Sequence, residues 1–553
     1  MAYKHGVYVR EQDTSLVTPI EATAGLQVIF GTAPINMSEA PYKMANRPVL
    51  CNTFAEAVTS VGYSDDYKKY TLCQSIDACF RVFNVAPIIL INVLDPNKSE
   101  HVREVSEDLL KLKKGTAVIK EAEYEYVITG DTVYRNDKFY FSKADGDTFT
   151  ALTGYEVGQS VPANTYERKV TSSKDAFGIL LDKVTVKSAD GATTYVKGTD
   201  YILSFDDDGY VIVTALADGA IKGDDTVRVS FTALNPDGVT ADDIIGGLDF
   251  STGDVTGLEC INKIYPMFGL TPGLILAPGW ANDPNVIAAI EAKCTNINGC
   301  FSCNCVLDIG SNAADASKTA PTAALKYSDV KVAKENLGID SPMSIVCWPY
   351  GKIGDKIYAM SALVGALMAF TDGNNDDIPY VYPSNKSLGI TGICLEDGTD
   401  VVLDQEQANV VNSYGVVTAL NMNGYKCWGN NTAAYPSTTD PKDRWIAIRR
   451  MFTWWGNTLI LSYFQKVDDP MNFRLIESIV DSENIRGNSF VARGVCAVAK
   501  CEYKPDENPI TSILDGKITF HIYLSPYTPA EDIEFVLEFD PYAIQNALEG
   551  GNS

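Results

Sequence analysis

The stretch Gly25-Leu26-Gln27-Val28-Ile29-Phe30-Gly31 is a short apolar run between two glycines. A run of this length bounded by turn residues is typical of a strand that is covered on both faces. The run from Ala86 to Leu94 has the same character, and helix-like segments at 54–61 and 75–83 lie between the two runs. Strands and helices therefore alternate, which predicts an α/β sheet.

The alternation resumes from about Asp249. Apolar strand-like runs lie at 273–278, 303–308 and 343–348, and helix-like segments lie at 286–294 and 357–370. Strands separated by helices pair in parallel, and a parallel sheet is covered on both faces. We therefore expect one doubly covered α/β core that is built from two separate parts of the chain.

The segment between these parts has a different pattern. A charged segment at 102–114 favours a helix, and the chain then becomes acidic and rich in Gly/Asp turns. Strand-like runs at 184–186, 201–205, 210–213 and 227–231 have the spacing of a β-sandwich. The pattern predicts an inserted, surface-facing β-rich domain.

The last third favours an α+β unit. Its apolar residues recur first at steps of three or four, which is typical of a helix face, and then at alternate positions of a strand. The helix positions are Trp445, Ile448, Phe452, Trp455, Leu459 and Tyr463, and the strand positions are Ile518, Phe520, Ile522 and Leu524. The predicted division of the chain is an arm at 1–22, core at 23–98, insertion at 99–243, core at 244–435, C-terminal domain at 436–530, and a strand and tail at 531–553.

Charge and composition exclude several classes of protein. The 553 residues carry 71 acidic and 45 basic side chains, a formal charge of -26, which disfavours direct binding to nucleic acid or to anionic membranes. No apolar run approaches the roughly 18 residues that span a bilayer. We also expect no secretory signal peptide, and the 13 irregularly spaced cysteines indicate reduced thiols in a cytoplasm.

No catalytic motif stands out. The three histidines are His5, His101 and His521, none in a catalytic context, and there is no G-x-S-x-G elbow or phosphate-binding loop. Cysteines 294, 300, 303 and 305 lack the spacing of paired metal ligands and are interpreted as core thiols, and Asp206–Gly209 as a hairpin turn. We predict no catalytic, cofactor-binding or metal-binding residue, and no enzymatic activity.

Both ends of the chain have strand patterns that lie outside the domains. His5–Glu11 precedes the first buried strand by a polar stretch, and Ile533–Asp540 follows the last domain. Such strands gain most by pairing with an exposed sheet edge in their own chain or in a neighbouring one. The two patterns indicate a protein that links to copies of itself.

Several motifs resemble the tail sheath proteins of contractile bacteriophages and of related contractile injection systems, such as R-type bacteriocins, over most of the chain. Residues 6–11, Gly-Val-Tyr-Val-Arg-Glu, are similar to the PGVYVEE opening of that family, with His5 where proline is usual. Residues 420–432, followed by Trp445, Arg449 and Arg450, resemble its LN..G...WGNRT...RR signature, with Asn431 in place of the usual arginine.

The resemblance implies a core with the fold of subtilisin but without protease activity. It implies subunits that stack as hexameric rings, a helical polymer, around a tail tube protein and that also meet baseplate and tail terminator proteins. Contraction would drive the tube through a cell envelope without a nucleotide. The protein would lie in a virion tail or an extracellular contractile particle, after assembly in the bacterial host cytoplasm, with no direct contact to nucleic acid and no membrane insertion.

The resemblance also implies roles for particular residues. The arms would cross into neighbouring subunits and complete their sheets through Val7, Tyr8, Val9, Ile533, Phe535, Leu537 and Phe539. Charges that would line the inner surface and face the tube are Arg474, Glu477, Asp481, Glu483 and Arg486. For Arg449 and Arg450 two alternatives stay open: a solvated face, or buried ion pairs between subunits of so acidic a chain. An ordinary solvated helix explains the charges from 474 to 486 equally well. A subtilisin-like serine peptidase and a surface adhesin that displays the β domain are the competing functions.

Overall fold

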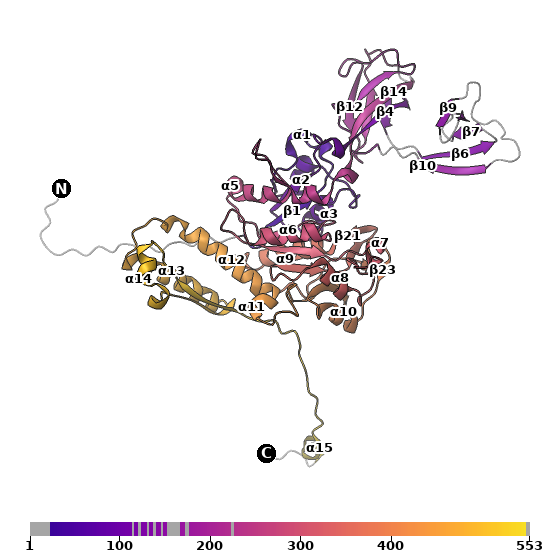
Figure 1. The fold of residues 1–553 in the computed structure, drawn as a ribbon. Coiled ribbons are helices and arrows are strands. Elements are labelled where there is room, and N and C mark those ends of the chain that lie inside the picture. The colour runs from indigo at the N-terminus through magenta and orange to yellow at the C-terminus, as the bar shows by residue number, and fades with distance from the viewer. Residues whose placement is uncertain are drawn as a thin grey trace, which may run out of the picture.

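The computed structural model describes residues 23–112, 115–119, 123–129, 132–135, 140–144, 148–151, 166–171, 176–222 and 226–548. A central α/β body carries a β-rich part on one side and a smaller helix-and-strand part on the other, and the chain then runs away from the body to a last short helix (Figure 1). The mixed α/β, multidomain character that the sequence predicts is confirmed.

An eight-stranded sheet forms the centre of the body, in the order β2-β3-β1-β17-β18-β19-β24-β25. The six inner strands are parallel, and β2 and β25 close the two edges as antiparallel strands. The bounds are β1 Gln27–Gly31, β2 Val49–Cys51, β3 Ile88–Asn92, β17 Leu274–Leu276, β18 Asn304–Asp308, β19 Ser344–Cys347, β24 Val416–Asn421 and β25 Tyr425–Trp428. The first two apolar runs of the sequence, β1 and β3, are neighbours in it.

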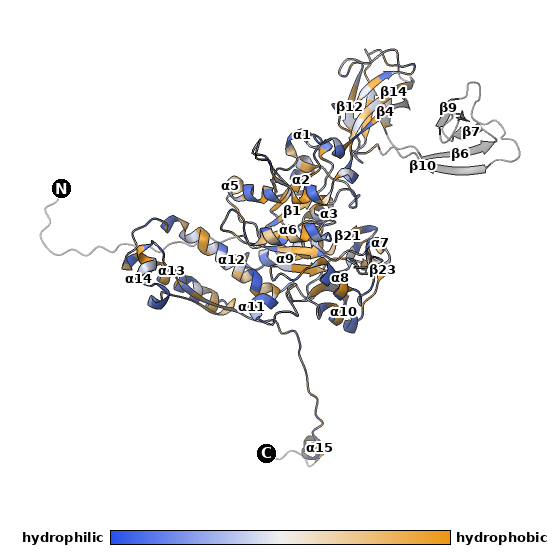
Figure 2. Ribbon diagram, in the orientation of Figure 1, coloured by the Kyte–Doolittle hydropathy of each residue, from blue (hydrophilic) through white to orange (hydrophobic). Residues whose placement is uncertain are grey.

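Helix α9 is the central helix of the body. It runs over Met360–Gly373, and 12 of its 14 residues are buried, because it packs on β1, β17, β18 and β19. Apolar residues concentrate on the central strands and on this helix, whereas the outer helices alternate between apolar and polar residues (Figure 2). The other helices of the body are α1 Pro41–Met44, α2 Phe54–Val61, α3 Leu72–Asp77, α4 Ala241–Ile245, α5 Ile264–Phe268, α6 Pro284–Cys294, α7 Ala313–Ala316, α8 Val330–Leu337 and α10 Gln405–Asn412.

Short strands complete the body. They form a four-stranded sheet, β21-β20-β22-β23, and a two-stranded hairpin, β15-β16. Their bounds are β20 Tyr350–Ile353, β21 Lys356–Tyr358, β22 Gly392–Cys394, β23 Asp400–Val401, β15 Gly247–Leu248 and β16 Val255–Thr256.

The inserted part is built from strands, but its first element differs from our expectation. Residues 102–111 form the strand β4, Val102–Lys111, and the predicted helix at 102–114 is wrong. The reason is a long-range pairing: β4 lies antiparallel to β14, Thr226–Leu234, and buries side chains such as Val229 and Phe231 in a local core. Tertiary pairing of this kind overrides the local preference of charged residues for a helix.

Three sheets make up the insertion, in the orders β11-β14-β4, β12-β13-β5 and β10-β6-β7-β8-β9. The remaining bounds are β5 Thr116–Ile119, β6 Glu123–Thr129, β7 Thr132–Arg135, β8 Tyr140–Ala144, β9 Thr148–Ala151, β10 Tyr166–Thr171, β11 Thr185–Ser188, β12 Tyr201–Phe205 and β13 Val211–Ala215. The β-rich character that the sequence predicts is thus present.

The C-terminal part has its own apolar core. Trp454, Trp455 and Phe490 pack at its centre, and the strand β27 begins at His521, so Ile518 and Phe520 precede the strand on which we placed them. The expected helix is α12, in which Trp454 is buried as well as Trp455. The elements are α11 Pro441–Arg444, α12 Ile446–Tyr463, α13 Phe473–Ala492, β26 Cys496–Glu502, α14 Ile510–Leu514, β27 His521–Pro526 and α15 Pro541–Leu548.

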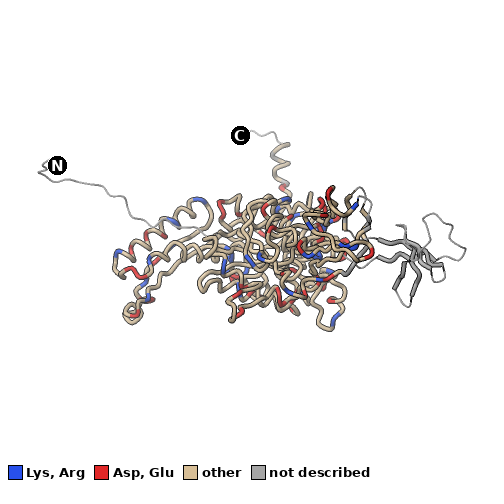
Figure 3. The backbone as a smooth tube through the Cα atoms, turned by 90° about the horizontal axis from the view of Figure 1, so that it is seen from above, with Lys and Arg blue, Asp and Glu red and all other residues tan. Residues whose placement is uncertain are grey.

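Seen from above, the molecule is elongated, and basic and acidic residues are interspersed along it (Figure 3). Helix α15 stands away from the body in this view as well. A search of the described residues finds no helix that is both long enough and apolar enough to cross a membrane.

A buried lysine holds the loops around β24. The Lys334 ammonium donates to the carbonyl oxygens of Tyr414 at 2.6 Å, Ala433 at 2.6 Å and Tyr435 at 3.1 Å. Gly415 lies beside this cluster with a φ of +69°, and a Cβ there would approach the oxygens of Thr432 and Tyr435 to 2.5 Å, so the turn requires glycine. Lys334 therefore ties α8 to the chain on both sides of the β24–β25 hairpin.

We predict that Lys334→Met lowers the free energy of unfolding by about 2–4 kcal/mol, because three buried carbonyls lose a charged donor. Denaturant unfolding followed by circular dichroism measures this change. Lys331→Met is the matched control, since Lys331 is 53% exposed and only 3.9 Å from Glu335, and it should change stability by less than about 0.5 kcal/mol. Equal effects of the two substitutions would contradict the structural role of Lys334.

Candidate functional site

The described histidines lie in structural settings. The buried His101 ring accepts from the backbone N–H of Asp95 at 3.0 Å and lies 3.3 Å from Asp243. His521 lies 3.0 Å from Glu507. His5 is outside the described residues. Neither described imidazole contacts a serine hydroxyl in the way that a hydrolase requires.

One serine does pair with a buried carboxylate, at the carboxyl end of β18. Ser361, in the first turn of α9, donates its backbone N–H to Asp308 Oδ1 at 2.8 Å and its hydroxyl to Oδ2. Both residues are buried, and burial raises the pKa of Asp308 from its ordinary 3.8 to about 7. The Ser361 oxygen is thus enclosed, and the pair joins the sheet to its central helix.

The cysteines and the aspartate turn fit the interpretations that the sequence favours. Cys294, Cys303 and Cys305 are buried and Cys300 is exposed, and burial raises the pKa of the Cys294 and Cys305 thiols well above the ordinary value. Asp206 accepts from the backbone N–H groups of Asp208 and Tyr210, which closes the hairpin between β12 and β13. Among the residues that the structure describes, no three His, Cys, Asp or Glu side chains are placed to hold a metal ion.

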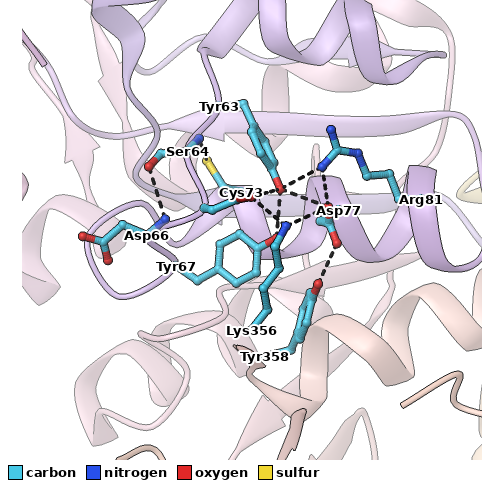
Figure 4. A network of polar contacts seen from close by, with 10 residues as sticks. Tyr63, Ser64, Asp66, Tyr67, Cys73, Asp77, Arg81, Lys356 and Tyr358 are labelled. Carbon is cyan, nitrogen blue, oxygen red and sulfur yellow. Dashed lines mark hydrogen bonds and ion pairs between the residues drawn. The ribbon is translucent and has the colours of Figure 1, made fainter. Parts of the chain in front are cut away.

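A dense polar cluster surrounds Asp77 (Figure 4). The carboxylate accepts from Tyr63 at 2.9 Å, from Arg81 at 3.0 Å and from Tyr358 at 2.6 Å. Lys356 donates to the Tyr67 hydroxyl at 3.3 Å, and burial raises the pKa of all three phenols. The cluster joins residues 63–81 to the β20–β21 hairpin, which makes it a structural clamp between two parts of the core.

Two arginines at the start of α12 have partners within the chain. Arg449 lies 3.1 Å from Asp443. Arg450 is 3% exposed and forms a two-pronged ion pair with Asp372 of α9, which is 0% exposed, and donates to the carbonyl oxygen of Ala24 at 3.2 Å. The idea that Arg450 faces a tube or pairs with another subunit does not fit this position, because its partner is buried in the same chain.

The charges of α13 separate into two groups. Arg474, Glu477 and Asp481 are exposed, at spacings of three and four that place them on one side of the helix. Glu483 and Arg486 are buried and lie 3.3 Å apart, with the Arg486 guanidinium 4.0 Å from the ring centre of Trp455. The prediction of a surface role is therefore wrong for Glu483 and Arg486, which belong to the core of the C-terminal part.

The C-terminal arm, residues 527–540, is extended but is not a strand in this structure. The large apolar side chains from 533 to 539 are 65–95% exposed, and Val536, which the predicted alternation did not include, is among them. The arm therefore buries neither face within its own chain. The exposed apolar residues are Ile533, Phe535, Val536, Leu537 and Phe539.

Helix α15 follows the arm and was not expected from the sequence. Asp540 accepts from the N–H groups of Tyr542 and Ala543, and Pro541 occupies the first turn. An aspartate followed by proline is a helix-start signal that sequence reasoning could have used. The residues proposed for the other arm, Val7, Tyr8 and Val9, lie outside the described residues.

The two-stranded sheet of the C-terminal part has an open edge at β27. Among the described strands, β26 and β27 each pair only with the other, and α13 packs against β26. On the outer side of β26, the Asn484 side chain of α13 accepts from the Cys501 N–H at 2.9 Å and donates to the Cys501 carbonyl oxygen at 3.0 Å. The edge that can accept an added strand is therefore that of β27. An extended apolar arm and an open sheet edge thus occur in the same chain.

Comparison with known proteins finds relatives among phage tail sheath proteins. No family model matches the sequence. The tail sheath protein of Burkholderia phage BcepMu is 24% identical over 568 residues, which cover 100% of this chain and 99% of that protein. The tail sheath protein of Escherichia phage P2 is 24% identical over 320 residues, which cover 57% of this chain and 74% of that protein.

A solved structure has the same fold. The sheath complex of an extracellular contractile injection system, PVC, in its contracted state, superposes with a TM-score of 0.53 over 98% of this chain and 99% of that chain, at 12% identity. The resemblance to contractile tail sheath proteins that the sequence motifs indicate is thus confirmed. The likeness of the core to subtilisin stays a prediction.

We predict that Asp308→Asn removes a pH dependence of stability. A carboxyl whose pKa is raised on folding holds more protons in the folded state between about pH 4 and 7, so the wild type loses stability from this group as the pH rises through that range. The asparagine variant should therefore gain on the wild type across this window, by on the order of 4 kcal/mol, and the difference should be constant above it.

Unfolding free energies at a series of pH values from 4 to 9 test this prediction. Asp315→Asn is the control, because Asp315 is an exposed carboxylate that pairs with Lys318 on the surface. A difference between wild type and Asp308→Asn that does not vary with pH would refute the assignment of this titration to Asp308.

Proposed function

We propose that this chain is the structural subunit of a contractile tail sheath. The observation that carries the proposal is the similarity to a phage tail sheath protein along the whole length of both chains. In this proposal subunits stack as hexameric rings around an inner tail tube, and contraction drives the tube through the envelope of a target cell. The partners are copies of the chain, the tube protein, and the baseplate and terminator proteins at the two ends of a virion tail or injection particle, which is assembled in the host cytoplasm.

The C-terminal arm is the proposed link between subunits. Large apolar side chains gain about 1.5–3 kcal/mol each when they leave water, so the five exposed residues of the arm strongly favour burial against another surface. The open β26–β27 sheet of a second copy offers both backbone partners and an apolar core underneath. Val7, Tyr8 and Val9 of the N-terminal arm are proposed to join the same linkage, on the strength of their strand pattern.

Fewer charged residues are available for the proposed contact with the tube than the sequence indicated. Of the seven charges considered, Arg474, Glu477 and Asp481 are exposed on one side of α13 and can meet a partner. Arg450, Glu483 and Arg486 are excluded by burial, and Arg449 is paired with Asp443 of its own chain.

The energy for contraction comes, in this proposal, from contacts between subunits. A metastable extended state converts to a compact one when new interfaces form, so the driving force is the difference in contact energy between two arrangements. The competing peptidase function gains no support, because the Ser361 hydroxyl is enclosed against Asp308. No specific observation favours the adhesin.

We predict that the arms are required for assembly but not for folding. Deletion of residues 1–22 or of residues 531–553 should leave the circular dichroism spectrum of the subunit intact and abolish long tubes in electron micrographs. Phe535→Ser combined with Leu537→Ser should weaken assembly by about a hundredfold or more, since two apolar anchors are lost at every link.

Glu534→Gln combined with Glu538→Gln is the matched control on the same arm and should still form tubes. Tubes of normal length from either truncation would contradict the linkage role of that arm. If the intact protein gives only dispersed particles under many conditions, the sheath function itself is refuted.

A further inference from the structure

The chain enters its described part through a buried anchor. Thr23 donates its hydroxyl to the carbonyl oxygen of Thr271 at 2.6 Å, and Arg450 holds the next carbonyl, that of Ala24, at 3.2 Å. Gly25 then lies against α9, where a Cβ would come within 3.2 Å of the Ala369 backbone. Residues 23–25, which we call the N-terminal root, are thus clamped between α9 and α12.

The C-terminal arm leaves through a different kind of anchor. The carbonyl oxygen of Tyr527 accepts from the Tyr382 hydroxyl at 3.0 Å, and Glu531 lies 3.5 Å from Arg444. The Arg444 and Glu531 side chains are 25% and 38% exposed. We call residues 527–533 the C-terminal root.

The C-terminal root also borders empty space. Residues 529–533 form one wall of a groove of about 640 Å³, and Tyr382, Trp428 and Arg444 contribute to its other walls. The groove contains polar side chains from α10 as well, among them Gln405 and Asn409. The root can therefore move without displacing a packed apolar core.

Arg444 is held in place independently of the arm. Its guanidinium lies 3.9 Å from the ring centre of Trp445 and 4.5 Å from that of Tyr435, and its Nε donates to Asn431 Oδ1 at 2.9 Å. Stacking on aromatic rings suits the planar guanidinium of arginine. When Glu531 leaves, the cation stays where it is and remains available for a carboxylate to return.

We propose that the short segment α11–α12 sets the exits of both arms, with a fixed root at Arg450 and a releasable latch between Arg444 and Glu531. The two ion pairs differ in burial: the Arg450–Asp372 pair is buried, and the Arg444–Glu531 pair is partly exposed. A buried pair is strongly destabilising to break because a charge is left without its partner, whereas a partly exposed pair contributes little. Arg444 is a positioning residue for the C-terminal arm, and its latch lets the arm change direction while the body of the subunit stays intact.

This inference deepens the proposed sheath function and rests on it for the role of the arms, but its test needs only single subunits. Cys300 is the exposed thiol among the 13 cysteines, so dyes can be attached there and at Val536→Cys, in the arm. Single-molecule energy transfer at high dilution then reports the fraction of subunits whose arm has left its latched position.

Arg444→Gln and Glu531→Gln should each raise the released fraction, by up to about fivefold, and the double variant should do no more than either one. High salt should have the same effect on the wild type and little effect on Arg444→Gln. Glu534→Gln, three residues further along the arm, is the control and should behave as the wild type. A released fraction that both single substitutions leave unchanged, or that Glu534→Gln raises equally, would overturn the latch.

The fixed root is tested by stability. Asp372→Asn should lower the midpoint of thermal unfolding, whereas Glu531→Gln should leave it unchanged, and an unchanged midpoint for Asp372→Asn would overturn the distinction between the two roots. Because these readouts do not involve assembly, a negative result refutes the latch and leaves the sheath proposal standing. Failure to form tubes would refute the sheath proposal alone.

Discussion

The ion pair between Arg450 and Asp372 is the contact on which the arrangement of the domains depends. Both side chains are buried, and the pair links α12 of the C-terminal part to α9, the helix at the centre of the body. The same guanidinium donates to the carbonyl oxygen of Ala24. The surrounding apolar cluster contains Ala24 itself, Ile378 from the segment after α9, and Met451 from α12. A separation of the C-terminal part from the body would leave two charges buried without partners, so the two parts behave as one unit.

Other buried polar groups play the same kind of role elsewhere in the body. Lys334 ties α8 to the loops around β24, Asp77 ties the segment around α3 to the β20–β21 hairpin, and Asp308 ties β18 to α9. Each lies where segments that are distant in sequence meet, and each makes at least two hydrogen bonds there. A buried charge is tolerated when its hydrogen-bonding capacity is filled, and it then fixes one geometry where apolar packing alone would accept several.

Elements that depend on a local pattern of residues could be predicted from the sequence, whereas elements that depend on contacts distant in sequence could not. Strands β1, β3, β17, β18 and β19 were predictable because each is an apolar run of strand length between turn residues, and α12 because its apolar residues recur at helical spacing. The motifs of the chain also indicated the sheath resemblance.

The predictions that were wrong or missing concern features that depend on contacts distant in sequence, or features whose local signal was overlooked. Strand β4 carries charges that favour a helix locally, and its pairing with β14 overrides them. The partner of Arg450 lies 78 residues away, and nothing in the residues around Arg450 identifies it. By contrast, α15 could have been predicted from the sequence, because Asp540 followed by Pro541 is a local signal for the start of a helix.

A polymer that contracts imposes two opposite demands on its subunits: neighbours must stay connected, and the directions of the connections must change. An arm that is buried in a neighbour satisfies the first demand through many apolar contacts, and none of these has to break if the bend occurs at the root instead. A change of direction costs least free energy where the root is held by a partly exposed ion pair beside an open groove, as at Glu531. It costs more where the root is clamped between two helices, as at Ala24. In the proposed sheath, the asymmetry between the two roots would serve both demands, because a subunit with two loose arms would transmit no rotation, and one with two rigid arms would permit none.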